Sequence, residues 1–295
     1  MTNFAHTTYT YTEMKRIIYL LLPVLLVSSC FFFGQGGTQD DQSSTGIVAG
    51  QGSGITVLSN PVITLGQMEL PVIEDDDIII THKGFTLSYN ADACIPEWVA
   101  YELTADETRG EAEREDALFQ KDPSYRNTQA MREDYSGSGW TKGHMACAGD
   151  FHWDKEALDE TFYLTNICPQ DEELNKGDWN YLEKQIRYWA RDYGKVWVVS
   201  GPIIGDNIYG TIGDRDVVIP DAFFKAVLIE KKGKYHSIAF VMDNDDKRYY
   251  LDNCAMSVNE LEELTGLDFF PDLYDNTEET IESKVDFDIW GIKSR

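Results

Sequence analysis

One amphipathic helix between two groups of strand patterns is the feature that most constrains the fold of this chain. From Asp178 to Tyr193 the apolar side chains follow a 3.6-residue period, which is typical of a helix that buries one face. They are Trp179, Leu182, Ile186, Trp189, Ala190 and Tyr193. A second helix is predicted from Ser257 to Leu264, with Ser257 or Asn259 near its N-cap.

Short strand patterns lie on both sides of the first helix. They cover residues 78–80, 85–89 and 98–103 before it, and residues 195–200, 217–219, 224–229 and 237–242 after it. Residues 104–140 are polar and loop-like. Strands in runs, with a few helices inserted, predict a single α+β domain with a mainly antiparallel central sheet.

The composition allows a large core and argues against one class of protein. The chain has 295 residues, of which 42% are hydrophobic and 13% aromatic, enough for a sizeable core. Its formal net charge is −26. A protein that coats nucleic acid normally carries the opposite charge, because Lys and Arg make the phosphate contacts. The negative net charge is weaker evidence against an enzyme, since an enzyme needs only a local basic patch.

The N-terminus has the pattern of an export signal. An apolar run from Ile17 to Val27 follows Lys15-Arg16 and is too short to span a bilayer. It ends in Val27-Ser28-Ser29-Cys30, which resembles the lipobox of bacterial lipoproteins. The resemblance implies cleavage before Cys30 and a lipid on that residue. Met14 directly precedes Lys15-Arg16, so we expect it to be the true start. The alternative is a buried helix with a free cysteine.

These patterns divide the chain into three parts. We expect a leader and signal peptide at residues 1–29, a lipidated Cys30 with a flexible Gly/Ser/Thr/Gln/Asp-rich tether at residues 30–77, and the folded domain at residues 78–295. Val57, Val62, Ile63 and Leu65 leave open an edge strand at the end of the tether. The predicted location is the periplasm or the cell surface, with a lipid anchor in the membrane.

Four cysteines remain in the domain. An even number in an exported protein predicts two disulfides, for which three pairings are possible. We expect Cys147–Cys168 and Cys94–Cys254, because Cys147 and Cys168 both flank the candidate site described next. No C-x-x-C pair is present, so a structural zinc site is not expected.

Among the five histidines, His144 has the neighbours that catalysis requires. It lies in a Gly-rich stretch with Lys142 before it and Asp150 after it. For His6, His82, His152 and His236 a surface or packing role is expected instead. Lys-Gly-His alone is a weak signal, and a structural histidine is an equally good interpretation of it.

The start of the long helix supplies the partners of His144. Asn175, Trp179 and Glu183 recur every four residues, which places them on one side of consecutive turns. With Trp179 packed inward, Asn175 and Glu183 face one edge. An amide oxygen with a carboxylate and waters is a setting that Mg²⁺ prefers, although an Asn ahead of a helix is usually only a cap.

Several motifs resemble one known family in the same order. Asp134-Tyr-Ser-Gly-Ser-Gly-Trp-Thr-Lys-Gly-His-Met-Ala146 is similar to the signature of the DNA/RNA non-specific endonucleases, members of the ββα-metal nuclease superfamily. Thr161–Gln170 and Leu174–Trp179 resemble its second block, and further matches place the resemblance over residues 78–285. It implies a ββα-metal active-site motif and a metal-dependent nuclease that cleaves DNA and RNA with little sequence preference.

The resemblance also implies a role for each site residue. His144 corresponds to the general base, Asn175 to the direct metal ligand, and Glu183 to the residue that orients metal-bound water. Lys142 occupies an arginine position beside the scissile phosphate, and Arg114 matches a second phosphate-binding arginine. The expected metal is Mg²⁺, with Mn²⁺ or another divalent cation as alternatives. A homodimer is left open.

The sequence departs from the family at three positions. Thr141-Lys142 replaces Asp-Arg, so the bidentate grip of arginine on phosphate is lost, and Cys147 replaces a common proline. These changes keep two rivals open: a non-catalytic nucleic-acid-binding lipoprotein of the same fold, and a phosphodiesterase for another exported substrate. We expect one basic substrate cleft, formed by Arg114, Lys142, Lys176, Lys184 and Arg187.

Overall fold

The computed structural model describes residues 67–114 and 118–293. The predicted leader, the lipidated Cys30, and the tether as far as residue 66 lie outside these residues. The possible edge strand at Val57–Leu65 also lies outside the described residues. Within the described ranges, no helix has both the length and the apolar character needed to cross a membrane.

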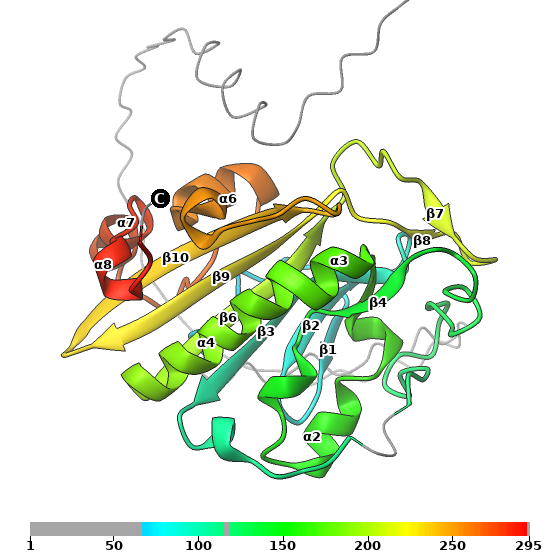
Figure 1. Cartoon of the computed structure of the whole chain (residues 1–295), viewed down its shortest axis with the longest axis horizontal. Coiled ribbons are helices and arrows are strands. Elements are labelled where there is room, and N and C mark those ends of the chain that lie inside the picture. Colours follow the sequence, from blue (N-terminus) through cyan, green and yellow to red (C-terminus); the bar gives the residue numbers. More distant parts are fainter. Residues whose placement is uncertain (1–66, 115–117, 294–295) are drawn as a thin grey trace, which may run out of the picture. The chain divides into compact units, whose positions relative to one another are not determined.

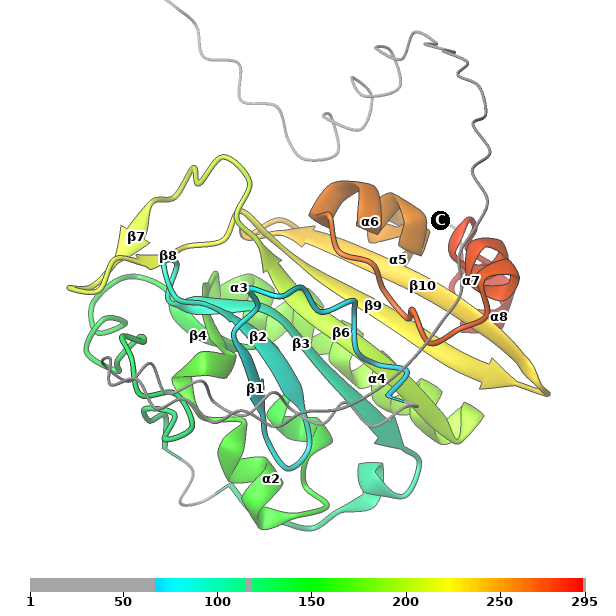
Figure 2. The ribbon, with the colours of Figure 1, turned by 180° about the vertical axis from the view of Figure 1, so that it is seen from behind.

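A seven-stranded antiparallel sheet forms the centre of the domain (Figures 1 and 2). Its spatial order is β1-β2-β3-β6-β9-β10-β11, and every neighbouring pair is antiparallel. The strands are β1 (Ile79–Thr81), β2 (Thr86–Asn90), β3 (Ile95–Thr104), β6 (Lys195–Ile203), β9 (Ala222–Lys231), β10 (Lys234–Asp243) and β11 (Ala255–Met256). The predicted α+β class with an antiparallel sheet is confirmed, and all the predicted strands except that at 217–219 fall within or beside these bounds.

The predicted amphipathic helix is α4 (Asn180–Tyr193), which lies across one face of the sheet (Figure 1). Its inner face is buried, as the 3.6-residue period predicts, and carries Leu182, Ile186, Trp189 and Ala190. The helix ends at Gly194, whose φ of +89° is a conformation that glycine adopts readily. Two short elements precede α4: α3 (Glu172–Leu174) and the π-helical turn η4 (Asn175–Trp179).

The second predicted helix is α6 (Val258–Thr265), and Ser257 is its N-cap. The Ser257 hydroxyl accepts from the Glu260 amide, and the Glu260 carboxylate accepts from the Ser257 amide, which is a capping box. Three further short helices lie near it in sequence: α5 (Leu251–Cys254), α7 (Asp275–Glu282) and α8 (Phe287–Trp290).

Two small two-stranded sheets flank the large one. β4 (Thr141–His144) pairs with β5 (Ile167–Gln170), and β7 (Thr211–Ile212) pairs with β8 (Val217–Val218). The predicted strand at 217–219 is therefore β8, outside the central sheet. The helix α2 (Lys155–Glu160) lies between β4 and β5 in the chain, and Asp154 caps it by accepting from two amides. The sequence did not predict β4 or β5, although β4 carries His144.

The disulfide prediction is wrong, because all four cysteines of the domain are free and buried thiols. Cys94 lies between β2 and β3, whereas Cys254 ends α5 next to β11. Strands about 4.8 Å apart place β3 and β10 roughly 14 Å from each other, beyond the reach of a disulfide. Cys147 lies four residues beyond Gly143, the partner of Cys168, so that pair is also separated.

The last residues assigned to the tether pack against the domain. Leu70 is 7% exposed, and the Val72 amide donates to the Asp268 carbonyl at 2.9 Å. The apolar residues Leu70 and Pro71 thus supply a buried segment ahead of β1. The described domain therefore includes residues 67–77 as well as the strands that follow.

Candidate active site

Strand β4 places two of the predicted site residues on one face. Lys142 and His144 are two residues apart in a strand, so their side chains point the same way. Gly143 between them faces Gln170 on β5, where a Cβ would lie 2.2 Å from the Gln170 Oε1 atom. Only glycine fits there, which explains why the motif requires it.

The His144 ring packs between two phenylalanines. Its centroid is 5.3 Å from that of Phe119 and 4.9 Å from that of Phe162, the latter edge to face. The Nε2 atom is buried and has no hydrogen-bond partner in the described part of the chain. Burial, and secondly the charge of Arg114, lower the pKa of His144 to about 3. The imidazole is therefore neutral at pH 7 with an unused nitrogen, as a proton acceptor requires.

Positive charge collects around this ring. The Arg114 guanidinium lies 5.0 Å from the Phe162 centroid, and the Lys142 Nζ lies 4.9 Å from that of Tyr135 and 5.5 Å from that of Phe119. Burial, and then Arg132, lower the pKa of Lys142. On a strongly acidic protein, this local cluster gives the site the positive potential that an anionic group requires.

Asn175 is fixed to β4 through its amide nitrogen. That nitrogen donates to the Thr141 hydroxyl at 2.9 Å and approaches the Lys142 carbonyl at 3.5 Å, while Thr141 itself donates to the Gln170 carbonyl at 2.8 Å. The Asn175 Oδ1 atom has no hydrogen bond within the described residues. An amide oxygen held in this way fits a hard divalent cation that completes its shell with waters.

The turn η4 separates Asn175 from the regular helix. Gly177 has φ −98° and ψ −105°, so the backbone leaves the helical conformation between Asn175 and α4. Single π-turns of this kind often occur at functional sites. The predicted four-residue spacing of Asn175, Trp179 and Glu183 is therefore distorted at its first step, although Trp179 is buried as expected.

Glu183 is a buried carboxylate on the inner side of α4. It is 8% exposed, and burial raises its pKa against the opposing charge of Lys225. Its carboxylate lies against the Cys147 thiol, three residues after His144. The neighbouring Arg187 donates to Asp150 at 2.6 Å, and Tyr101 donates to the same carboxylate at 2.7 Å.

Lys225 is a site residue that the sequence reasoning missed. This fully buried lysine donates to the Ser200 hydroxyl at 3.0 Å and to the Met145 carbonyl at 3.3 Å. Its Nζ is 4.6 Å from the centroid of the Trp179 ring. Lys225 thereby links β6 and β9 of the central sheet to Met145, the residue after His144. A lysine inside the apolar run Phe223–Ile229 was the signal available for it.

The predicted basic cleft divides into separate groups. Arg114 and Lys142 lie around His144, whereas Arg187 is paired with Asp150. Lys176 and Lys184 line a different surface on the outer side of α4, and Lys176 forms an ion pair with Glu172. Lys184 lies on the exposed face of α4 next to the buried residue 183, and Lys176 is exposed on the turn η4 that precedes it.

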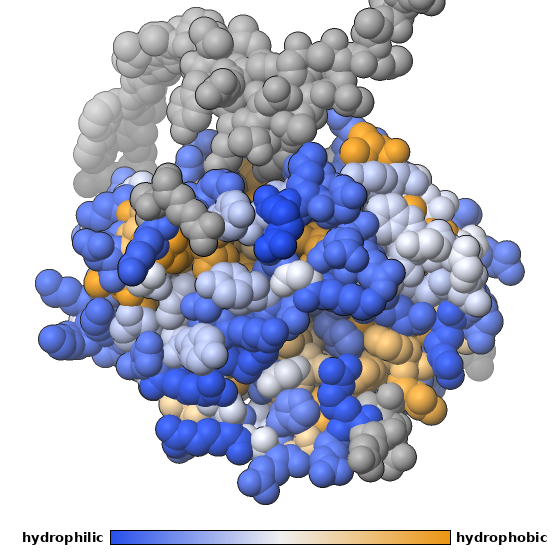
Figure 3. Space-filling view, viewed as in Figure 1, coloured by the Kyte–Doolittle hydropathy of each residue, from blue (hydrophilic) through white to orange (hydrophobic). Residues whose placement is uncertain are grey.

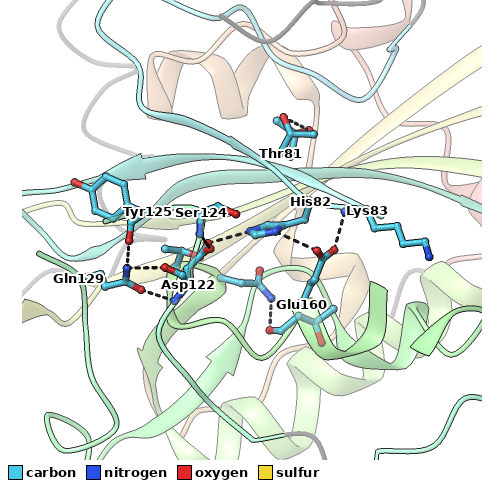
Figure 4. Close-up of polar contacts among 12 residues, drawn as sticks. Thr81, His82, Lys83, Asp122, Ser124, Tyr125, Gln129 and Glu160 are labelled. Atoms are coloured by element: carbon cyan, nitrogen blue, oxygen red, sulfur yellow. Dashed lines mark hydrogen bonds and ion pairs between the residues drawn. The ribbon is translucent and has the colours of Figure 1, made fainter. Parts of the chain in front are cut away.

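His82 forms a separate polar cluster (Figure 4). Its Nε2 is 3.0 Å from the Asp122 carboxylate, and its Nδ1 is 3.7 Å from that of Glu160. The Thr165 hydroxyl donates to Asp122 at 2.6 Å. Burial opposes the charge on His82, but the hydrogen bond to Asp122 and the nearby carboxylate of Glu160 prevail and raise the pKa to about 9. The expected packing role fits, with His82 as a buried cation.

Comparison with known proteins places this site in a family. The sequence model of the DNA/RNA non-specific endonucleases matches residues 64–276. The chain belongs to that family. Mitochondrial nuclease EXOG of Xenopus laevis is 38% identical over 202 residues, covering 63% of this chain and 56% of its own length. The same nuclease of Danio rerio is 35% identical over 257 residues, covering 78% of this chain and 74% of its own length.

Endonuclease G and a solved structure show the same relationship. Human mitochondrial endonuclease G is 32% identical over 206 residues, covering 65% of this chain and 69% of its own length. A crystal structure of an EndoG/EndoGI complex superposes with a TM-score of 0.67 at 28% identity, covering 72% of this chain and 92% of the matched chain. The fold is therefore that of the non-specific endonuclease family.

One departure from the family signature has a backbone explanation. Cys147, at a position where the family commonly has proline, has φ −65° and ψ 121°. A proline ring fixes φ near −65°, so the cysteine retains the backbone geometry that proline would impose.

Proposed function

We propose that this protein is a metal-dependent endonuclease that hydrolyses phosphodiester bonds of DNA and RNA with little sequence preference. The observation that carries the proposal is the arrangement on β4. A neutral His144 and a cationic Lys142 share one face, and Asn175 is held to the same strand with its amide oxygen unengaged. Family membership supports the same reaction class.

The residues of the chain divide the work of the reaction. His144 accepts a proton from the attacking water, because its imidazole is neutral and its Nε2 is unpaired. Lys142 and Arg114 hold the phosphate in line by charge, and Glu183 orients water on the metal side. A divalent cation, Mg²⁺ in our proposal, with Asn175 as its protein ligand, supplies charge stabilisation at the phosphate and the leaving oxygen when bound.

Little sequence preference follows from the groups available. Arg114 and Lys142 are suited to phosphate oxygens, which carry no base identity. Lys176 is assigned to substrate binding outside this centre, on the outer surface of α4. The two cations around His144 thus select the phosphate backbone and not a base.

The direct test is degradation of plasmid DNA and of RNA by the purified protein, with Mg²⁺ and with EDTA. The proposal expects cleavage of both polymers that depends on the cation. Binding of both polymers without cleavage favours the non-catalytic nucleic-acid-binding rival. Cleavage of a small phosphodiester alone favours a phosphodiesterase for another substrate.

We further propose that the protein is exported and anchored by a lipid on Cys30. The support is the run Ile17–Val27 followed by Val27-Ser28-Ser29-Cys30. Metabolic labelling with a radioactive fatty acid should label the wild-type chain and not Cys30→Ala. Equal labelling of both chains, or of neither, contradicts the anchor without affecting the nuclease proposal.

A further inference from the structure

A groove of about 830 Å³ lies on the outer side of α4, away from the buried face that carries Glu183. Its walls are the exposed side of the helix, the segment 248–252 and the segment 290–293. The face that carries α4 in Figure 1 is mostly hydrophilic in Figure 3. We call it the α4 groove, and its charged and aromatic lining includes Lys176, Lys184, Arg248, Lys293, Tyr181 and Tyr250.

The α4 groove is locally positive on a chain whose net charge is −26. Four cations line it, against the two carboxylates Asp178 and Asp252, and one of the four, Lys176, is paired with Glu172. Asp178 is already engaged by Arg248 and by the Tyr249 amide, and the Arg248 side chain remains 76% exposed. Lys184 and Lys293 form no ion pair with another described residue. A polyanion is therefore the ligand that this lining favours.

Two tyrosines give the groove flat apolar surfaces. Tyr181 is 51% exposed and Tyr250 is 43% exposed, although large aromatic side chains are usually buried. Cations together with exposed aromatic rings are the combination that binds single-stranded nucleic acid, because unpaired bases stack on the rings while phosphates meet the cations. An acidic peptide would use the cations but gain little from the rings.

The groove borders the candidate active site in sequence. Lys176, which lines the groove, directly follows Asn175, and Lys184 lies on α4 eight residues after Lys176. The residue proposed to hold the metal is thus followed at once by a cation of the groove.

We propose that the α4 groove is a subsite for the unpaired nucleic-acid strand that flanks the scissile phosphate. The inference rests on the proposed function for the identity of the polymer. Lys184, Lys293 and Arg248 contact phosphates, and Tyr181 and Tyr250 stack on bases. The groove consequently gives a preference for single-stranded over duplex substrate that the centre around His144 does not supply.

The test measures binding without cleavage. Fluorescence anisotropy of a labelled single-stranded DNA of about 20 nucleotides, in EDTA, reports affinity whether or not the protein is a nuclease. We expect Tyr181→Ala to weaken binding about 10-fold. Tyr188→Ala is the matched control, because Tyr188 lies on the same helix, is 52% exposed and does not line the groove. It should bind like the wild type.

The charge contribution has its own control. Lys184→Gln should reduce the slope of log affinity against log salt by about 0.7, the value for one phosphate contact to a single strand. Lys232→Gln, at the exposed β9–β10 turn, should leave the slope unchanged.

Equal effects of Tyr181→Ala and Tyr188→Ala overturn the proposal, as does absence of wild-type binding. Equal competition by polyglutamate overturns it in favour of an acidic protein partner. Failure of the proposed function appears separately, as absence of Mg²⁺-dependent cleavage with binding retained.

Discussion

His144 and His82 are both enclosed by the same fold, and their protonation states are opposite. Around His144 lie two phenylalanine rings and a cation, so burial and Arg114 lower its pKa to about 3. Around His82 lie two carboxylates, which outweigh burial and raise its pKa to about 9. The neighbours of an imidazole thus decide whether it accepts a proton or serves as a fixed cation.

A short segment connects the two histidines. Gln120 forms backbone hydrogen bonds with Phe162 and Leu164, Phe119 packs on His144, and Asp122 binds His82. Asp122 also accepts from the Ser124 amide, which fixes the turn after it. The charged cluster therefore anchors the segment that encloses the neutral histidine. The cluster around His82 contributes to stability, and His144 is the proton acceptor that we propose.

The largest expected effect separates these roles by activity. His144→Ala should reduce kcat for plasmid nicking with Mg²⁺ by about 10²–10⁴-fold, because the proton acceptor is lost. His82→Gln should retain most of its kcat at pH 7 if the protein remains folded. Circular dichroism of both variants checks the fold. A His144→Ala variant that cuts like the wild type would refute the assignment of the base.

The second effect separates the roles of His82 and His144 by the pH dependence of stability. The pKa of His82 is higher in the folded protein than in the unfolded chain. Its contribution to the free energy of unfolding is therefore fully present below pH 6.5 and disappears as the pH rises through about 9. The shift corresponds to about 3 kcal/mol of unfolding free energy. Urea denaturation of the wild type should show this loss between about pH 6.5 and pH 9. His82→Gln should lack it, and an equal loss in both proteins contradicts a charged His82.

A smaller effect concerns the residue that links β4 to Asn175. Thr141→Val removes the hydroxyl that accepts from the Asn175 amide, so the amide oxygen is no longer held toward the cation. The Mg²⁺ concentration for half-maximal cleavage should rise about 10–100-fold, as for other residues that orient a metal ligand. Thr141→Ser keeps the hydroxyl and serves as the control. An unchanged Mg²⁺ requirement in Thr141→Val would show that Thr141 does not position Asn175.

The sequence predicted most of the fold for a simple physical reason. Strand and helix periods are local, so β3, β9, β10 and α4 are visible from their own residues. The capping box at Ser257 is equally local. β4 and β5 were missed, because Gly143, Pro169 and the polar Thr141 lack a strand pattern and only their pairing makes them strands.

The site was predicted from a resemblance more than from local pattern. Three segments far apart in the sequence supply the site residues that come together in space, which are His144, Lys142, Arg114 and Asn175. The burial of Glu183, the role of Lys225 and the charge of His82 depend on neighbours from other strands. No local period encodes such contacts. Thr141, a departure from the family signature, has a partner in Asn175 that only the structure identifies.

The charge states of the two histidines can be measured directly by NMR titration of protein labelled at its histidines. His144→Gln and His82→Gln identify the two signals. We expect His144 to stay neutral and His82 to stay protonated between about pH 5 and pH 8, a range in which a free imidazole titrates. A His144 signal that titrates near pH 6.5 with a protonated form below it would contradict the enclosure by Phe119 and Phe162 that keeps this imidazole neutral.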